Sequence, residues 1–570
     1  MKQSIGNFLL RRLHEAGIRH IFGVPGDYNL EFMQQLEDRG DPAWIGTCNE
    51  LNGSYAADGY ARIRGLAALA VTNGVGALSA MNGIAGAYSE HVPVICICGS
   101  LPLRSRERSE MMHHTLADGG GGNFYRAFSE VTAAQAELSP ENAVLEVDRL
   151  ILTAWRRKLP VYLELPSDIS YIEIDVPEEP LQLTDVGSDQ ERLRTAARAI
   201  LARLDAAKSP AFLLDLDADR FGVLGHIERL AKKLEMPVAV LNTCKSAFDE
   251  TSPLFAGVYL GVASSPATRN AVEKSDCLLT VGLRRLDSTS AFFTDAIPAS
   301  AVHLNARSIN LGLENYQAVN LRELLETLID GSAPALRRSV LNTAQPAAGA
   351  VKPAQESLTQ AHYWKALETF LRPGDVILAE DGTSNSGATD MRLPAGCSFV
   401  TQAVWGSIGY TVGALLGALC AAPDRRHILF VGDGSFQLTA QELSTILRHD
   451  LKPFIFLINN GGYTIERAIL GKNARYNDIA NWRYAGLASV FCRESTAECF
   501  TVATVEELQH VLDAPHKGLV FVEALMDKDD SPESLIRGGH AFADSDFGPT
   551  GPQFVPNANI PLPRSQDRQL

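Results

Sequence analysis

The chain has 570 residues, of which 46% are hydrophobic and 21% charged, so it is long enough for three or four domains of a globular enzyme. The formal net charge of −16 argues against nucleic acid and anionic membranes as partners. No uninterrupted apolar run reaches the roughly 18 residues of a transmembrane helix, so we expect no membrane span.

Residues 1–17 predict the first helix of a domain. Their apolar positions recur at helical spacing, with arginines between them: Ile5, Phe8, Leu9 and Leu13. A one-sided apolar face is better explained by a domain helix than by a targeting peptide.

The nine cysteines are scattered, and none has the spacing of a zinc site. Cys96 and Cys98 lie in an apolar, strand-like run, where alternate positions share a face. We therefore expect reduced, buried thiols in a cytoplasmic protein.

Helical and strand-like segments alternate along the chain, which predicts an α/β fold of three domains with parallel sheets flanked by helices. A first unit covers residues 1–180, with strands predicted at 18–24, 67–72, 92–98 and 161–165. A polar stretch with two prolines, residues 177–189, predicts a linker. A second unit covers residues 190–342, with strands predicted at 211–214, 237–241, 277–281 and 301–304.

An Ala/Pro/Gln-rich stretch, residues 343–355, has no apolar periodicity and predicts an exposed linker. The third unit covers residues 356–546. Residues 547–570 hold five prolines and no helical pattern, so we expect an extended or disordered Pro-rich tail. The first and third units could share a fold, but the sequence does not show it.

The segment Gly432–Asn460 carries the strongest chemical signal. An apolar strand, residues 427–431, leads into Gly-Asp-Gly-Ser, and a helix-like run and a second strand then end at Asn459-Asn460. The glycines let the backbone approach an anion closely, and Asp433 and Asn460 offer the oxygen ligands that a small divalent cation prefers. Gly-Asp-Gly alone is weak, and the strand–helix–strand context makes it specific.

Four further stretches occur in the order found in one family. They are Gly23–Leu30, Cys48–Asn52 with Ala56–Tyr60, Met112–Leu116, and Gly462–Arg467. With the Gly-Asp-Gly segment they resemble the thiamin-diphosphate-dependent 2-oxo acid decarboxylases, over about residues 3–543. The indolepyruvate and branched-chain types are the most similar, on three segments: His113–Asp118, Trp405–Thr411 and Arg475–Trp482.

The resemblance implies a pyrimidine-binding domain, a middle domain and a diphosphate-binding domain, with thiamin diphosphate and Mg2+ as cofactors. Glu50 would bond the pyrimidine ring and promote deprotonation of the thiazolium carbon. The Gly406 carbonyl would accept from the pyrimidine amine, and Ile408 would hold the cofactor bent. The competing interpretations are that Glu50 only caps the next helix and that Ile408 is an ordinary core residue.

For the metal, the resemblance assigns Asp433, Asn460 and the Gly462 carbonyl as ligands, with diphosphate oxygens and water completing an octahedron. Diphosphate contacts would come from Thr383, Gly434 and Ser435. The competing interpretation of Asp433 is a plain turn former.

The proton relay of the family matches Asp27, His113, His114 and Glu466 of this chain. After CO2 leaves, a carbon must be protonated, which calls for groups that titrate near neutral pH. The alternatives are turn chemistry for Asp27, structural roles for the histidines and a helix-dipole role for Glu466. The glycine run after the histidines, residues 119–122, favours a mobile active-site loop.

The resemblance places the substrate pocket at Asp381, Asn385, Ile465, Gly538 and Phe542. Relatives carry a large aromatic residue near Asn385 and larger apolar residues near Gly538-Gly539, where two glycines would loosen a helix. We therefore expect substrates larger than pyruvate: branched, aromatic or longer linear 2-oxo acids. Asn73 and Ala77 also depart from the family, with no functional account from sequence.

The family also implies a homodimer as the minimum unit, because Glu50 and Asp433 would serve one cofactor from different chains, and a homotetramer is common among relatives. Alternatives are a thiamin-dependent carboligase similar to acetolactate synthase and a non-catalytic family member. The histidine pair disfavours the first, and the presence of Glu50, Asp433 and Asn460 disfavours the second. No G-x-G-x-x-G opens a helix after the first strand, which disfavours a dinucleotide dehydrogenase.

Overall fold

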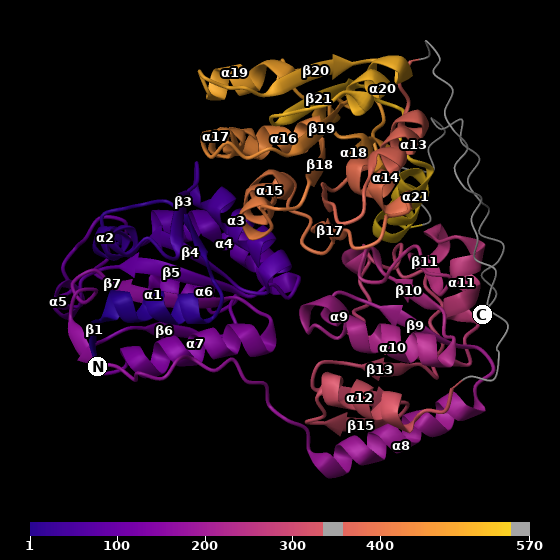
Figure 1. The fold of residues 1–570 in the computed structure, drawn as a ribbon. Helices are drawn as coiled ribbons and strands as arrows, with labels where there is room; N and C mark the ends of the chain where they lie inside the picture. The colour runs from indigo at the N-terminus through magenta and orange to yellow at the C-terminus, as the bar shows by residue number, and fades with distance from the viewer. Residues whose placement is uncertain (335–356, 549–570) are drawn as a thin grey trace.

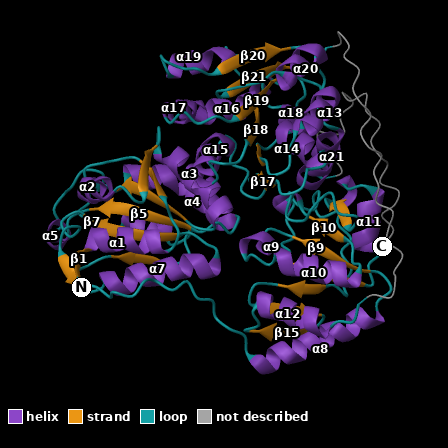
Figure 2. Ribbon diagram, viewed as in Figure 1, coloured by secondary structure: helices purple, strands orange, loops and turns teal. Residues whose placement is uncertain are grey.

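The computed structural model describes residues 1–334 and 357–548, and it has three parts, each built on one large sheet (Figure 1). Helices cover both faces of the sheets (Figure 2). The predicted linker at 343–355 and the tail from 549 onward lie outside the described residues. Phe547, predicted to begin the tail, is instead the last residue of helix α21 (Glu533–Phe547).

The first sheet has six strands, all parallel, in the order β3-β2-β4-β5-β7-β6. A short antiparallel pair, β1 with β8, ties residues 2–4 to residues 173–175. The elements are β1 (Lys2–Ser4), α1 (Ile5–Glu15), β2 (His20–Gly23), α2 (Leu30–Arg39), β3 (Ala43–Gly46), α3 (Glu50–Arg64), β4 (Ala67–Thr72), α4 (Val75–Ser89), β5 (Val94–Ser100), α5 (Leu103–Glu107), α6 (Asn123–Phe128), β6 (Gln135–Glu137), α7 (Ala143–Arg157), β7 (Val161–Pro166) and β8 (Glu173–Asp175).

The middle sheet is mixed. Strands β11-β10-β9-β12-β13 are parallel, as predicted, and an antiparallel hairpin, β14-β15, extends the edge, which was not predicted. The elements are α8 (Gln190–Ala206), β9 (Pro210–Leu214), α9 (Asp217–Arg220), α10 (Leu224–Leu234), β10 (Val238–Val240), β11 (Phe255–Val258), α11 (Pro266–Glu273), β12 (Cys277–Val281), β13 (Val302–Leu304), β14 (Ser308–Leu311), β15 (Glu314–Gln317) and α12 (Leu321–Gly331), with 3-10 turns at Asn242–Cys244 and Gly261–Ala263.

The third sheet again has six parallel strands, in the order β17-β16-β18-β19-β21-β20. The elements are α13 (Gln360–Phe370), β16 (Val376–Ala379), α14 (Thr383–Asp390), β17 (Ser398–Val400), α15 (Tyr410–Ala421), β18 (His427–Gly432), α16 (Asp433–Thr439), α17 (Leu443–Arg448), β19 (Phe454–Asn459), α18 (Thr464–Ile469), α19 (Leu487–Phe491), β20 (Glu498–Val502), α20 (Val505–Asp513), β21 (Val520–Leu525) and α21, with 3-10 turns at Ala440–Glu442, Arg475–Asn477 and Tyr484–Gly486.

The first and third units share one topology, which the sequence had left open. When the strands of each six-stranded sheet are numbered along the chain, both sheets have the order 2-1-3-4-6-5. In such open sheets ligands bind beyond the carboxyl ends of the strands, where the order reverses between strands 1 and 3. That position lies after β2 and β4 in the first unit and after β16 and β18 in the third.

Continuous apolar runs make the central strands, because both faces of a parallel sheet are covered. The predicted bounds of β4 and β12 agree with the structure, whereas β5 begins and ends two residues later than predicted. Cys96 and Cys98 point into the cluster shared by the first and third units, and Ile95 and Ile97 point into the opposite one. The expectation that both thiols share a buried face is confirmed.

The first and third units are joined through α3 and α15, which cross at glycines. A Cβ atom at Gly59 would lie 2.2 Å from the Ala414 carbonyl oxygen, and one at Gly417 would lie 1.8 Å from that of Ala56. Glycine is therefore required at both positions for this close approach. No helix in the described ranges is both long and apolar enough to cross a membrane.

Candidate active site

Asp27, His113 and His114 form one cluster beyond the carboxyl ends of β2 and β5. His113 Nε2 lies 2.5 Å from Asp27 Oδ2, and His114 Nδ1 lies 3.7 Å from Asp27 Oδ1. The two imidazoles meet edge to face, with centroids 4.6 Å apart. The predicted relay residues of the first unit thus come together, with Asp27 placed to orient and charge-stabilise an imidazole.

Tyr28 supports His113 and was not singled out from the sequence. Its ring stacks on His113 at 5.0 Å, and its hydroxyl lies 3.2 Å from both His113 Nδ1 and the His113 carbonyl oxygen. Tyr28 fixes the plane of the His113 imidazole, because it contacts both the ring and the backbone carbonyl of His113. Tyr28 directly follows Asp27, but its role becomes visible only when the loop carrying His113 packs against it.

Asn73 and Gly74 hold the other histidine. The Asn73 amide donates to the His114 carbonyl oxygen at 2.9 Å, and Asn73 is buried. Gly74 has φ +61°, and a Cβ atom there would lie 2.1 Å from the same carbonyl oxygen. The sequence alone suggested no function for Asn73, which differs from the family pattern, and the structure makes it a positioning residue for the segment of His114. Ala77, which also differs from that pattern, is buried in α4.

We predict that Asn73→Ala lowers kcat about tenfold, because small displacements of a proton-transfer group are costly, while the lost hydrogen bond changes stability by only about 1 kcal/mol. Gly74→Ala should have the larger effect, because the new methyl group displaces His114. Steady-state kinetics across pH and thermal unfolding measure both. The control is Asn142→Ala, which removes a comparable amide-to-carbonyl bond to Glu137 elsewhere in the same unit. Equal kinetic effects of the Asn73 and Asn142 variants would contradict the positioning role.

Glu50 is the first residue of α3, but it is not the cap. The N-cap is Asn49, whose side chain accepts from the Asn52 N–H at 2.8 Å. The Glu50 carboxylate lies against Gly76, where a Cβ atom would be 3.1 Å from Oε1. The side chain of Glu50 is thus free of the capping role that the sequence left open, and a glycine makes room for it.

The candidate metal site lies beyond β18 and β19. Asp433 is buried, and its carboxylate accepts the backbone N–H groups of Gly434 at 2.8 Å, Gly461 at 2.7 Å and Gly462 at 3.2 Å. These bonds bring the two loop ends together. Asn460 donates its amide to Thr464 Oγ1 at 2.9 Å, which leaves the amide oxygen as its ligand atom.

The residues present fit a divalent cation. Burial raises the pKa of Asp433 to about 6, against the lowering effect of the N–H groups. Only burial and backbone N–H groups act on Asp433 in the described ranges, with no basic side chain among them, so a bound cation would supply the missing positive charge. Gly434 and Ser435 lie in the first turn of α16, which begins at Asp433. The missing side chain of Gly434 makes room for the Tyr463 ring, 2.5 Å from where its Cβ would be. Backbone N–H groups at a helix start suit a phosphate group.

Gly406 and Ile408 lie in the loop before α15, which residues of the first unit hold in place. The buried carboxylate of Glu90 accepts the Val404 N–H at 2.8 Å and also pairs with Arg62 at 2.9 Å. Gly406 has φ +63°, as a glycine turn allows. Ile408 is only half-buried and belongs to none of the core clusters of the described residues, which disfavours its interpretation as a core residue.

Asp381 and Asn385, two of the residues predicted to line the substrate pocket, lie after β16. The Asn385 amide donates to Asp381 Oδ1 at 3.4 Å, and burial, together with nearby Glu380 and Glu90, raises the pKa of Asp381 well above its ordinary value. Ile465 approaches the same loop, 4.0 Å from where a Cβ atom of Gly382 would be. Thr383 begins α14, where its N–H can face a phosphate group.

Gly538 and Gly539 lie within α21, which runs from Glu533 to Phe547. The expectation of extra pocket space from both glycines is corrected at Gly539: its missing side chain makes room for α18, with Ala468 Cβ 3.1 Å from where its own Cβ would be. Of the two glycines, only Gly538 faces open space. The middle unit adds Phe292, which meets Phe542 edge to face at 4.7 Å and was not predicted.

Glu466 lies exposed in the first turn of α18 and is not part of the Asp27 cluster. Glu50 belongs to the first unit and Asp433 to the third, and no hydrogen bond or ion pair joins them in the described part of the chain. The candidate residues therefore form two sets within one chain, one beyond each of the two related sheets.

Comparison with known proteins assigns the three units. Residues 3–119 match the N-terminal thiamine pyrophosphate binding domain of the thiamine pyrophosphate enzymes, residues 197–327 their central domain and residues 382–524 their C-terminal thiamine pyrophosphate binding domain. Thiamine pyrophosphate is another name for thiamin diphosphate. The two thiamine pyrophosphate binding domains thus correspond to the two related sheets, and the central domain corresponds to the mixed sheet.

Whole-length relatives agree. The chain is 39% identical to an alpha-keto-acid decarboxylase of Mycolicibacterium paratuberculosis, over 94% of this chain and 95% of that protein. It is 39% identical to a pyruvate decarboxylase of Aspergillus terreus (93% and 95% covered) and 36% identical to pyruvate decarboxylase isozyme 2 of Saccharomyces cerevisiae (94% and 97%). With the three domains in place, the chain belongs to the thiamin-diphosphate-dependent 2-oxo acid decarboxylases.

Proposed function

We propose that this enzyme converts 2-oxo acids larger than pyruvate to an aldehyde and CO2, using Mg2+ to anchor thiamin diphosphate. The observation that carries the proposal is the cluster of Asp27, His113 and His114 at the switch point of the first sheet. Decarboxylation replaces a carboxylate with hydrogen, so one proton must reach the former carbonyl carbon. Paired imidazoles beside a carboxylate are suited to that transfer.

Each set of residues has a part in this mechanism. When bound, thiamin diphosphate supplies the nucleophilic carbon and the electron sink for CO2 loss. Asp433, Asn460 and the Gly462 carbonyl hold the cation, and Thr383, Gly434 and Ser435 receive the diphosphate. Glu50 bonds the pyrimidine, while the Gly406 carbonyl and Ile408 orient the two rings. Asp27, His113, His114 and Glu466 move the proton.

A homodimer, and from it a homotetramer, would join the two sets across an interface. Apolar side chains stand exposed near both switch points: Val75 (56%) and Leu78 (47%) on α4, and Leu438 (51%) on α16. Covering them by a second copy removes apolar surface from water. We propose a cytoplasmic enzyme, since all nine cysteines are free thiols, as a reducing compartment would keep them.

A substrate panel tests the proposed function. Aldehyde formation is measured with thiamin diphosphate and Mg2+ on pyruvate, branched, aromatic and long linear 2-oxo acids. We expect kcat/KM for the preferred larger acid to exceed that for pyruvate at least about tenfold, the usual gain from filling an apolar pocket. A highest kcat/KM for pyruvate would reject the proposed preference, and no cofactor-dependent aldehyde from any acid would reject the decarboxylase function.

A further inference from the structure

Asp27, His113 and His114 place one carboxylate and two imidazoles within reach of a single ion. One ligand atom from each residue lies within 4.8 Å of the other two. No other group of three His, Cys, Asp or Glu side chains in the described ranges comes this close together. Two imidazoles and one carboxylate, with a position left open to water, are a donor set that holds Zn2+ in proteins.

The hydrogen bonds of Tyr28 assign the nitrogen of His113 that faces Asp27. The Tyr28 hydroxyl donates to the His113 carbonyl oxygen at 3.2 Å, so its oxygen accepts from Nδ1–H, also at 3.2 Å. Nε2 then faces Asp27 Oδ2 at 2.5 Å. A nitrogen lone pair and a carboxylate oxygen meet at that distance only with a positive charge between them. That charge is either the second proton of an imidazolium or a metal ion.

His114 adds a ligand atom that no hydrogen bond uses. Its Nδ1 atom has no hydrogen-bond partner in the described part of the chain, and it lies 3.7 Å from Asp27 Oδ1. The gap is too long for a hydrogen bond, but it is close to the roughly 3.3 Å between two ligand atoms on one tetrahedral Zn2+. Asp27 and His113 are exposed, so an ion from solvent meets them first and gains His114 as its third ligand.

The proposed magnesium site differs from this cluster in its donor atoms. Asp433, Asn460 and the Gly462 carbonyl offer oxygen alone, which Mg2+ prefers. Imidazole nitrogen favours Zn2+ over Mg2+. The two ions are therefore expected at different units of the chain.

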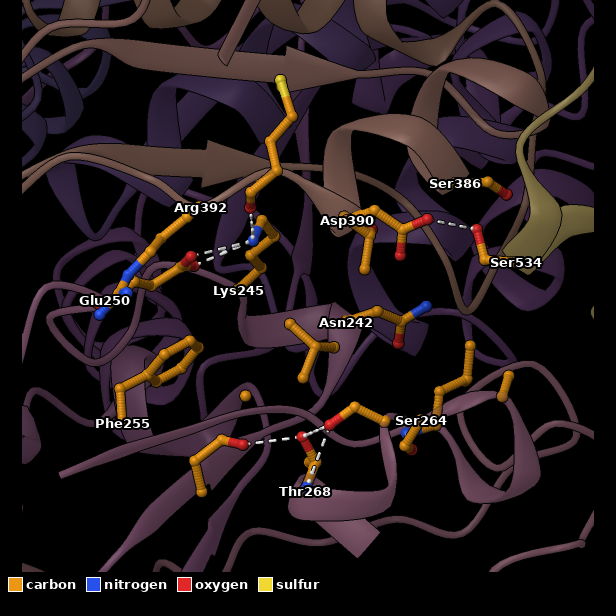
Figure 3. A pocket seen from close by; sticks show the side chains of 18 of the residues that line it. Asn242, Lys245, Glu250, Phe255, Ser264, Thr268, Ser386, Asp390, Arg392 and Ser534 are labelled. Atoms are coloured by element: carbon orange, nitrogen blue, oxygen red, sulfur yellow. Dashed lines mark hydrogen bonds and ion pairs between the residues drawn. The ribbon is translucent and has the colours of Figure 1, made fainter. Parts of the chain in front are cut away.

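The cavity between the middle and third units does not compete for zinc. It has a volume of about 200 Å³ and no histidine or cysteine in its lining (Figure 3). Its two carboxylates are already used, Glu250 by Lys245 at 3.0 Å and Asp390 by Ser534 at 2.8 Å. Zinc is therefore expected at the cluster of the first unit rather than in this cavity.

We propose that Asp27, His113 and His114 bind Zn2+ and that the bound ion inhibits the enzyme. Both imidazoles must be neutral to coordinate, so the ion displaces the proton between His113 and Asp27 to solvent. The relay then has no proton to deliver to the former carbonyl carbon. The inhibitory role rests on the proposed function, whereas the binding of zinc does not.

Binding is measured on wild-type enzyme with thiamin diphosphate and excess Mg2+, which keeps the site of Asp433 filled. Co2+ serves as the spectroscopic probe for Zn2+, because tetrahedral Co2+ absorbs visible light and thiolate ligands add a near-ultraviolet band. We expect one tetrahedral Co2+ per chain, without the thiolate band and displaced by Zn2+. Absence of the visible band overturns the proposal.

Variants locate the site by isothermal titration calorimetry with Zn2+. His113→Gln and His114→Gln each remove one nitrogen ligand and should weaken affinity about a hundredfold or more, whereas Tyr28→Phe removes only the group that orients His113 and should cost about tenfold. The control is His14→Gln, because His14 is paired with Asp41 at 2.8 Å but has no second imidazole in that pair. It should keep full affinity. Wild-type affinity in both ligand variants overturns the assignment. If one variant does not fold, the other and the Co2+ spectrum still decide.

Aldehyde formation in the presence of Zn2+ tests the inhibitory role. We expect kcat to fall in step with occupancy, by about a hundredfold or more at saturation, because general acid–base groups contribute at least that much. A zinc-selective chelator should restore it. Zinc bound at the cluster with full activity overturns the inhibitory role. An enzyme inactive on every acid before zinc is added is the separate failure of the proposed function, and the Co2+ spectrum then still decides the metal site.

Discussion

Glu50→Gln lowers kcat by about a thousandfold or more, because general acid–base groups contribute about 10² to 10⁴ in rate and this carboxyl is proposed to control the proton of the cofactor pyrimidine. Glutamine is nearly isosteric, and Asn49 rather than Glu50 caps α3. The fold should therefore be retained, with at most about 1 kcal/mol lost from the helix dipole. Aldehyde formation and thermal unfolding measure the two effects.

The matched control is Glu191→Gln. Glu191 also lies in the first turn of a helix, α8, and is exposed in the middle unit. It should leave kcat unchanged within about twofold, since surface substitutions have small effects. An active Glu50→Gln enzyme would remove the carboxyl from the mechanism, whereas unfolding of the variant would assign Glu50 a structural role instead.

Asp433→Ala should weaken the binding of thiamin diphosphate with Mg2+ by about a hundredfold or more. The substitution removes a proposed metal ligand and leaves the N–H groups of Gly461 and Gly462 without their acceptor. Removing the partner of buried charged hydrogen bonds costs about 3 kcal/mol or more. Isothermal titration calorimetry gives the dissociation constant without depending on turnover.

Thermal unfolding gives a second measure of the same loss. A ligand at about 100 times its dissociation constant stabilises the folded state by about 2.7 kcal/mol, so wild-type enzyme should unfold at a higher temperature with cofactor and Mg2+. The Asp433→Ala variant should not respond. Asp513→Ala, at the exposed end of α20 in the same unit, is the control and should respond like wild type. Full affinity in the Asp433 variant would place the metal elsewhere.

Local sequence was sufficient for the fold class and for most central strands, but not for the whole architecture. Uninterrupted apolar runs predicted the central strands, because both faces of these sheets are buried, and Gly-Asp-Gly after an apolar strand marked the turn into α16. The antiparallel edge β14-β15 escaped prediction because neither strand has a continuous buried run: β14 buries only alternate residues, and Glu314–Gln317 has no fully buried residue. The shared topology of the first and third units escaped too, since strand order is set by long-range pairing.

The residues of the candidate site likewise fall into those that the sequence identified and those that only the tertiary structure revealed. Sequence identified the residues whose chemistry and motif context are specific: Glu50, His113, His114, Asp433 and Asn460. Only the tertiary structure showed what holds them. Asn73 and Tyr28 are ordinary residues until the loop of His113 and His114 folds back on them. From the sequence, Gly539 was expected to enlarge the substrate pocket, but Ala468 occupies the space that its side chain would fill.

The sequence by itself thus determined the fold class, the family and the identity of the reactive side chains, because these depend on local periodicity and on motifs of a few residues. The tertiary structure alone decided which backbone atoms position those side chains and which glycines serve packing. The physical reason is that such contacts join residues far apart in the chain, and the order of strands and the crossing of helices bring them together.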